Sequence, residues 1–269
     1  MLASTLVRFL TLDSDLTNLQ HLSAASGLCW LGNYLYVVAD DSLHLGVFSE
    51  SQSLPGHLYR LLPGELPSGH KERKKAKPDF EVLAYWANYS GAEGGALLAL
   101  GSGSKSNRCN GVVIPLDANY GIMDKPFSFD LAPIYSLLAP RFPDLNIEGA
   151  VIQSEELWLF HRGNSEGGKS ALIMLPISAL HSCLERVAPD ANDPVIRVKP
   201  LELGTRDGVA LTVTDATRLA DGCVLFTAAA ENTSNTYDDG ECAGSVMGML
   251  SPTGEMLWSE PLSGQDKVE

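Results

Sequence analysis

Several features that mark common classes of protein are missing from this sequence. Basic residues are few, because 19 Lys and Arg stand against 33 Asp and Glu, for a formal net charge of −14. Nucleic-acid binding needs a basic surface that displaces counterions from phosphates, and docking on anionic lipid needs positive charge as well. No apolar run approaches the roughly 20 residues of a membrane span. We therefore expect neither a nucleic acid nor a membrane as a partner.

Targeting and redox signals are also missing. The first fifteen residues have no basic region, and Arg8 interrupts their apolar stretch, so they make a poor secretory signal. The five cysteines are odd in number and include no close pair. Such a pattern is typical of reduced thiols and not of a disulfide framework. The sequence thus predicts a cytoplasmic protein.

The common catalytic and metal motifs are missing too. No two histidines have the spacing of a zinc site, and there is no Cys-x-x-Cys. Residues 163–167 have the letters of a nucleophile elbow, which requires a strand, a tight turn and a helix. A strand-like run follows them instead, at 171–175. No catalytic residue is therefore assigned, and whether the protein is an enzyme stays open.

Short apolar runs are abundant. Seventeen runs rich in Val, Leu, Ile and aromatic residues are separated by Gly, Asn, Asp and Pro, which is the pattern of strands. Helical periodicity appears over useful length at Ala132–Leu138 and Ile177–Val187. A charge run at 71–77, with prolines beside it, is expected to be a solvated loop. The fold class is all-β.

An internal repeat narrows the class further. Four segments share a polar or acidic start, a strand, a turn, and a second strand ending in a polar group; they start near residues 26, 81, 148 and 215. The spacing from Ser26 to Asp40, from Glu148 to Arg162, and from Thr217 to Glu231 is 14 residues each. Each pair is followed by two more strands. Four-stranded antiparallel units of this length predict the blades of a β-propeller, with a β-sandwich as the rival.

The repeat brings together a set of acidic residues. The first strand of each blade lines the central channel of a propeller, and loops at one mouth form the usual ligand site. Carboxylates gathered there repel one another unless a cation or an arginine lies among them, so Ca²⁺ or Mg²⁺ is a candidate ligand. Alternatively, the acids cap strand ends and pair with Arg162 or with backbone amides. The candidate metal ligands are Asp40, Glu81, Glu148, Asp215 and Glu231, with Arg162 and Ser26 beside them.

A second candidate site is the segment 101–108, Gly-Ser-Gly-Ser-Lys-Ser-Asn-Arg. Successive small residues after a strand can expose backbone N–H groups to an anion, and two basic residues add positive charge. The segment is not a P-loop, because no glycine precedes Lys105 directly and no helix is predicted after it. A flexible loop between strands is the alternative. For a small anionic ligand the candidate residues are Ser26, Ser102, Ser104, Lys105, Arg108 and Arg162.

Several of these motifs resemble known proteins. The segments 26–28 and 35–41 look like the first blade of the phytase-like (or esterase-like) bacterial propellers. The motifs at 77–81, 101–104, 146–149 and 162–164 are similar to an uncharacterised bacterial propeller family akin to them. The resemblance spans nearly the whole chain and implies a propeller with polar residues at one mouth. The phytase name would imply calcium-assisted hydrolysis of phosphate esters.

The end of the chain repeats the start of a blade. Lys267-Val268-Glu269 matches Asp79-Phe80-Glu81 and Asn146-Ile147-Glu148. We therefore expect one domain over residues 1–269, a five-bladed propeller whose last blade is incomplete, with Leu6–Leu12 as the outer strand of that blade. Four or six blades are the alternatives.

Three functions fit this reading. The first is binding of a small anionic ligand or a divalent cation at the mouth. The second is a metal-assisted phosphoesterase, in which carboxylates hold Ca²⁺ and Lys105, Arg108 or Arg162 holds the phosphate. The third is a platform for protein interactions, a frequent use of propellers.

Overall fold

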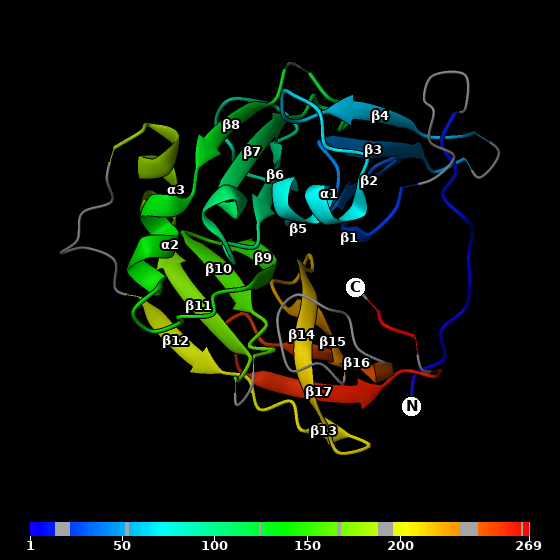
Figure 1. Ribbon diagram of the computed structural model, residues 1–269, viewed down its shortest axis with the longest axis vertical. Coiled ribbons are helices and arrows are strands. Elements are labelled where there is room, and N and C mark those ends of the chain that lie inside the picture. Colours follow the sequence, from blue (N-terminus) through cyan, green and yellow to red (C-terminus); the bar gives the residue numbers. More distant parts are fainter. Residues whose placement is uncertain are drawn as a thin grey trace. The chain divides into compact units, whose positions relative to one another are not determined.

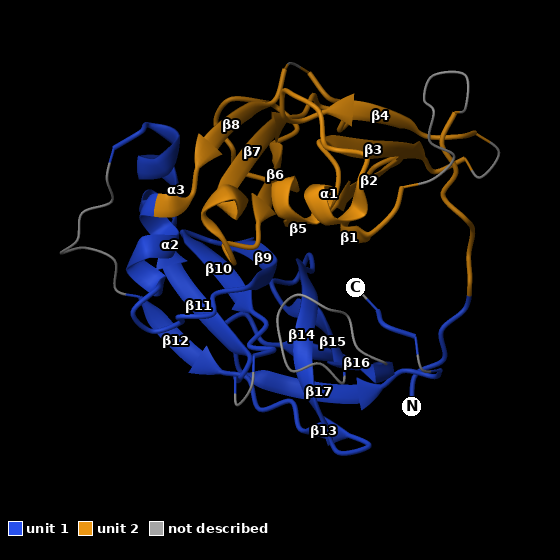
Figure 2. Ribbon diagram, in the orientation of Figure 1, with its two compact units in different colours: residues 1–5, 133–269 blue, residues 6–132 orange. Residues whose placement is uncertain are grey.

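The computed structural model describes residues 1–13, 22–51, 54–123, 125–165, 168–187, 196–231, 242–264 and 266–268. The chain is mostly β, as the sequence predicts (Figure 1). It divides into two compact units, drawn in different colours in Figure 2. Unit 2 is Leu6–Ala132, and unit 1 combines Met1–Thr5 with Pro133–Glu269.

Each unit contains two antiparallel sheets in which successive strands are neighbours. The sheets of unit 2 consist of β1 (Ala25–Leu31), β2 (Tyr34–Ala39), β3 (His44–Ser49) and β4 (His57–Arg60), then of β5 (Phe80–Trp86), β6 (Ala96–Gly101), β7 (Asn110–Pro115) and β8 (Phe127–Asp130). The sheets of unit 1 consist of β9 (Ile147–Gln153), β10 (Glu156–His161), β11 (Ala171–Pro176) and β12 (Arg197–Pro200), then of β13 (Thr205–Arg206), β14 (Val209–Arg218), β15 (Val224–Glu231), β16 (Cys242–Leu250) and β17 (Met256–Pro261). These are four blades of about four strands, as in a β-propeller.

The helices are short. Two lie where periodicity predicts them, α2 (Ala132–Leu138) and α3 (Ile177–Leu184). The charge run expected to be a loop instead forms α1 (His70–Ala76), and η1 (Ser106–Arg108) is a 3₁₀ turn. Lys, Arg, Glu and Ala are strong helix formers, so the composition of α1 outweighs its lack of an apolar face. No helix among the described residues is long and apolar enough to cross a membrane.

A β-bulge recurs at the same place in each blade. The first long strand of every blade has one residue that is skipped in its pairing with the second strand. The four skipped residues are Ser26, Glu81, Glu148 and Thr214. A bulge re-aims the side chain of the extra residue and is a recurring feature near functional sites. The repeat in the sequence therefore reflects a repeat in backbone geometry.

Two glycines that follow these bulges let the first strands approach closely. A Cβ at Gly27 of β1 would lie 2.9 Å from the backbone N of Leu83 in β5. A Cβ at Gly149 of β9 would lie 2.8 Å from the backbone N of Ala216 in β14. The Ser-Gly and Glu-Gly pairs of the sequence thus mark where one blade packs on the next within each unit.

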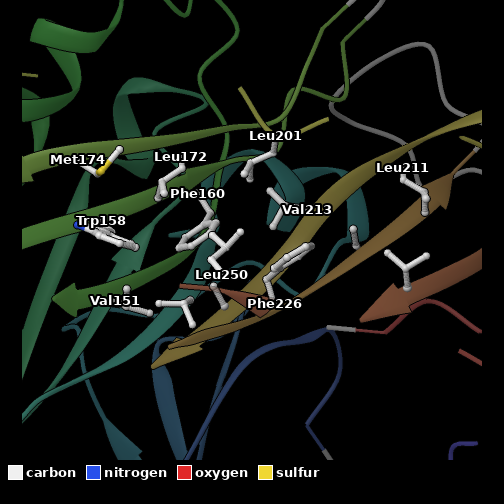
Figure 3. Packing of buried hydrophobic residues seen from close by; sticks show 14 of the residues in the cluster. Val151, Trp158, Phe160, Leu172, Met174, Leu201, Leu211, Val213, Phe226 and Leu250 are labelled. Carbon is white, nitrogen blue, oxygen red and sulfur yellow. The ribbon is translucent and has the colours of Figure 1, made fainter. Parts of the chain in front are cut away.

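Each unit has its own apolar core between its two blades. In unit 1 the cluster includes Trp158 and Phe160 of β10 and Phe226 of β15 (Figure 3). In unit 2 it includes Tyr36 of β2 and Leu97 of β6. Both cores combine side chains of successive blades, because a single sheet cannot bury its faces alone.

The chain ends have their own pairings. Leu2 forms a parallel bridge with Leu262, and Leu12 forms one with Gly56. Leu6–Leu12, expected to be an outer strand, is not part of any strand among the described residues, and its bridge is at Leu12 alone. Near the other end, the Val268 N–H donates to Ser245 Oγ (3.1 Å). Glu269 lies outside the described residues.

Candidate functional site

Three carboxylates converge in unit 2. Asp40 directly follows β2, Asp79 directly precedes β5, and Glu81 is the bulge residue of β5. The Asp79 N–H donates to the Asp40 backbone carbonyl (3.0 Å), which fixes the two segments side by side. One carboxylate oxygen from each of the three residues lies within 4.8 Å of the others. We call this set the acidic triad.

Lys77 is the counter-ion of the triad. Its ammonium group forms an ion pair with Asp40, and Nζ lies 2.8 Å from Asp79 Oδ1. Burial lowers the pKa of Lys77, but the carboxylates of Asp79 and Asp40 outweigh this and raise it to about 12. Burial raises the pKa of Asp40, and the nearby Lys77 offsets this only in part. The charged form of the Asp40 carboxylate is therefore less stable than that of an ordinary aspartate.

Residues that follow β6 also contact the carboxylate of Asp79. Ser102 Oγ donates to Asp79 Oδ2 (2.5 Å), Arg108 Nη1 donates to it (2.8 Å), and Ser104 Oγ lies 3.3 Å from it. Arg108 is 4% exposed, and its Nε has no hydrogen-bond partner in the described part of the chain. Three residues expected to bind an external anion therefore face an internal carboxylate.

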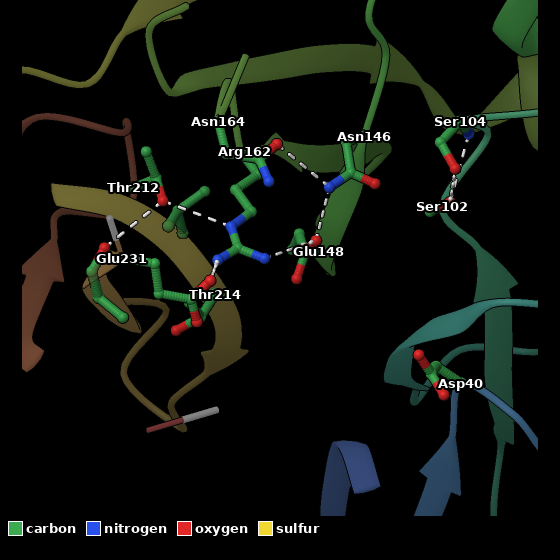
Figure 4. A network of polar contacts seen from close by, with 12 residues as sticks. Asp40, Ser102, Ser104, Asn146, Glu148, Arg162, Asn164, Thr212, Thr214 and Glu231 are labelled. Carbon is green, nitrogen blue, oxygen red and sulfur yellow. Dashed lines mark hydrogen bonds and ion pairs between the residues drawn. The ribbon is translucent and has the colours of Figure 1, made fainter. Parts of the chain in front are cut away.

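A second network is buried in unit 1 (Figure 4). Arg162 Nη2 donates to Glu231 Oε2 (2.6 Å), and Nη1 lies 3.4 Å from Glu148 Oε1. Lys267 Nζ lies 3.2 Å from Glu231 Oε1. Burial lowers the pKa of Arg162, but the two carboxylates outweigh this and raise it, so the guanidinium keeps its charge. Here two carboxylates face two cations.

The network continues to a buried histidine. Asn146 Nδ2 donates to Glu148 Oε1 (2.7 Å), and the Asn146 N–H donates to His161 Nδ1 (3.2 Å). The His161 ring lies 4.8 Å from the ring of Phe142, between centroids. Burial lowers the pKa of His161 to about 4, although the Asn146 contact and Asp144 oppose the shift. His161 is therefore neutral at pH 7.

Three residues of these networks occupy one equivalent position. In three blades the residue after the second strand donates its N–H to the residue before the first strand: Asp40 to Ala24 (3.1 Å), Ser102 to Asp79 (3.0 Å), and Arg162 to Asn146 (2.8 Å). The backbone is thus the same while the side chain is an acid, a hydroxyl or a base. The fold fixes the position, and the residue type sets the chemistry.

The remaining candidate residues have other contacts. Ser26 Oγ donates to the Phe80 carbonyl (2.5 Å), and the half-buried Lys105 directly precedes η1. Asp215 is half-buried and accepts the N–H of Ala216 (2.7 Å), while Thr214 occupies the bulge of that blade. The predicted acids are therefore divided, with Asp40 and Glu81 in unit 2 and the rest in unit 1.

Sequence reasoning missed Lys77 and Asp79 as members of the site. Both stand in the motif at 77–81, where only Glu81 was singled out. Asp79 adopts φ +59°, a conformation that Asp tolerates better than most residues. The signal that could have identified Asp79 was a pair of acidic residues flanking one apolar residue at the start of a strand.

Comparison with known proteins places the chain in a family. A model described as a family of unknown function, DUF6929, matches residues 21–269, so the chain belongs to that family. Among proteins with curated functions, none matches the sequence. The expected kinship with phytase-like propellers thus stays a hypothesis from the sequence.

Several solved structures are similar. The β-propeller domain of Cps50 (Swd1) from Myceliophteria thermophila has 12% identity and a TM-score of 0.37, over 91% of this chain and 57% of that one. Hydrazine synthase from Kuenenia stuttgartiensis has 8% identity and a TM-score of 0.40, over 88% and 49%. The WD40 β-propeller domain of Doa1 has 11% identity and a TM-score of 0.34, over 88% and 68%. The chain spans about half the length of the first two.

Proposed function

We propose that this member of the family binds a divalent cation, with Ca²⁺ the best fit, at the acidic triad of Asp40, Asp79 and Glu81. The observation that supports the proposal is the convergence of three carboxylate oxygens within 4.8 Å of one another. Oxygens that share one Ca²⁺ lie up to about 4.8 Å apart, which is twice the Ca–O distance. The site is thus of the right size for the ion that carboxylates prefer.

Charge also supports a cation. The triad brings three carboxylates together, with Lys77 and Arg108 among its ion-pair partners. Carboxylates this close together in a partly buried setting repel one another strongly. A bound Ca²⁺ would relieve this repulsion.

The ammonium group of Lys77 competes with Ca²⁺ for the carboxylates of this site. Its ammonium group holds the carboxylates of Asp40 and Asp79 that Ca²⁺ would bind. A divalent ion must therefore displace the ammonium or share the carboxylates with it, and Lys77 sets the affinity. Protons compete as well, and because the pKa of Asp40 is raised, this competition begins at a higher pH than for an ordinary Asp.

The proposal is limited to binding. Ser102, Ser104 and Arg108 donate to one another or to Asp79, so they would have to turn away before they could hold a phosphate. A small anionic ligand, calcium-assisted phosphoester hydrolysis and a protein-interaction role stay predictions.

We also propose that residues 266–268 begin the first strand of a fifth blade. The support is a repeated contact within unit 1. Ser170 Oγ, just before the third strand of one blade, accepts the N–H of Val213 in the first long strand of the next (3.0 Å). Ser245, near the start of β16, accepts the N–H of Val268 in the same way (3.1 Å).

Calorimetric titration with Ca²⁺ tests the cation proposal. We expect Glu81→Gln to weaken Ca²⁺ binding by about tenfold or more, since one charged ligand of three is lost. Glu148→Gln is the matched control, because Glu148 is the bulge residue at the same position of another blade but lies in the Arg162 network. Absence of binding by the unaltered protein at millimolar Ca²⁺, or equal loss in both variants, would refute the proposal.

Lys77→Gln sharpens the test. Removing the competing ammonium should tighten Ca²⁺ binding and make the melting temperature depend on Ca²⁺, because Asp40 and Asp79 then lose the ammonium group that they share. Lys267→Gln is the control, since Glu231 keeps Arg162. If Lys77→Gln binds Ca²⁺ no more tightly than the unaltered protein, Lys77 does not compete with Ca²⁺ at this site.

A further inference from the structure

Helix α1 presents basic side chains on two opposite faces. Arg73 and Lys77 point to the blades: Arg73 Nε lies 3.0 Å from Asp41 Oδ2, and Lys77 pairs with the triad. Residues two positions apart on an α-helix are separated by about 200°. Lys71 and Lys75 therefore lie on the face turned away from Asp41, and both are exposed.

Polar contacts anchor the helix. Asn107 Nδ2 donates to the carbonyls of Lys75 (3.2 Å) and Lys77 (3.1 Å), and Arg108 Nη2 donates to the carbonyl of Lys74 (3.2 Å). None of the helix residues is buried. A helix of seven residues is unstable by itself in water, so these side chains of η1 hold α1 in place. The outer lysines are not needed for that anchoring.

The outer face concentrates positive charge on an acidic protein. Five of the 19 Lys and Arg residues lie within residues 71–77, in a chain of net charge −14, and two of the five, Lys71 and Lys75, lie on the outer face. Glu72 is the one acid in that segment. Across the described ranges, neither Lys71 nor Lys75 has an ion pair. Their ammonium groups are therefore available to a partner.

We propose that the outer face of α1, marked by Lys71 and Lys75, binds an acidic segment of a partner polypeptide. A helix of this length extends about 10 Å, which is the reach of three or four residues of extended chain. The Debye length at physiological salt is about 8 Å, so a short acidic segment senses the patch and little of the acidic surface beyond it.

Nucleic acid fits this patch less well. A polyanion longer than the helix would continue over a protein surface that carries a net negative charge, and a patch of this size neutralises few phosphates. A short run of Asp or Glu can end where the positive charge ends. Charge complementarity over one short helix therefore favours a peptide.

The test uses a fluorescently labelled peptide of four glutamates as the probe, measured by anisotropy at low and at physiological salt. We expect Lys71→Glu/Lys75→Glu to weaken binding by about tenfold, since two exposed ion pairs become repulsions. Lys71→Arg/Lys75→Arg should retain binding because the charge is kept. Lys169→Glu is the control for loss of a lysine elsewhere, because Lys169 is 74% exposed in unit 1.

Each outcome decides the matter. Selective loss in the Lys71/Lys75 reversal, with binding by the arginine variant and by Lys169→Glu, supports the proposal. No peptide binding, equal binding by the reversal, or stronger competition by a single-stranded oligonucleotide of 20 nucleotides overturns it. The calcium titration remains a separate test, because Lys71 and Lys75 are not members of the acidic triad.

Discussion

The two polar networks use equivalent backbone positions with opposite charge. In unit 2 the residue after the second strand of the first blade is Asp40, and in unit 1 the residue at that position is Arg162. Arg162 is a base placed between the carboxylates of Glu148 and Glu231. The acidic triad instead gathers three carboxylates at one point, with Lys77 and Arg108 paired to its aspartates.

This difference separates a structural network from a binding site. A buried carboxylate is tolerated when it is paired and hydrogen-bonded, as Glu148 and Glu231 are. Carboxylates gathered closely in a half-buried setting repel one another, and a ligand cation can relieve that repulsion. The propeller blade supplies the same scaffold in both units, so side-chain identity alone decides which role results.

The largest expected effect is removal of the balancing arginine. Arg162→Met should lower the free energy of unfolding by about 3–5 kcal/mol, because Glu148 keeps only the neutral Asn146 as a partner. Arg108→Met should cost less, about 1–3 kcal/mol, because Asp79 retains Lys77. Urea unfolding measures both. Equal losses would mean that the two networks do not differ in how their carboxylates are paired.

Acid should weaken unit 1 through His161. The unfolded histidine takes up a proton near pH 6.5, whereas the folded one does so only at about 4. Acidification between these values therefore favours the unfolded state, by about 3 kcal/mol in full.

His161→Gln should remove that part of the pH dependence, measured as unfolding free energy at pH 7 and pH 4.5. His57→Gln, at an exposed position of β4, is the control and should leave it in place. An unchanged slope in His161→Gln would show that another group is responsible.

The smallest expected effect concerns the shared scaffold. Gly27→Ala and Gly149→Ala each bring a Cβ within 3 Å of a backbone nitrogen, so the first strands must move apart. We expect each to lose about 1–3 kcal/mol of stability, by similar amounts. A large loss in one and none in the other, by thermal melting, would show that the blade contact is not equivalent in the two units.

Much of the fold could be predicted from the sequence. Short β-branched and aromatic runs gave the strands, and the repeat gave units of about four strands, because a blade is a local unit whose contacts are with its neighbours. Residues 71–77 were misread because a charge run has no apolar period, yet helix propensity and the contacts with Asn107 make it a helix.

The site could be predicted in part. Asp40 and Glu81 were both proposed as metal ligands, and the structure brings them together with Asp79. The sequence could not show that Ser102 and Arg108 turn to Asp79, because these contacts join residues more than 20 positions apart.

The sequence by itself determined what is local or periodic: the strands, the turns between them, the repeated polar positions and the excess of acid. Only the tertiary structure decided which acid meets which base. Strand register and bulges bring distant residues within hydrogen-bond distance, and a shift of one residue moves a side chain to the other face of the sheet. The acidic triad exists because the first blade packs on the second, where the Asp79 N–H donates to the Asp40 carbonyl and brings Asp40 and Glu81, far apart in the chain, close together.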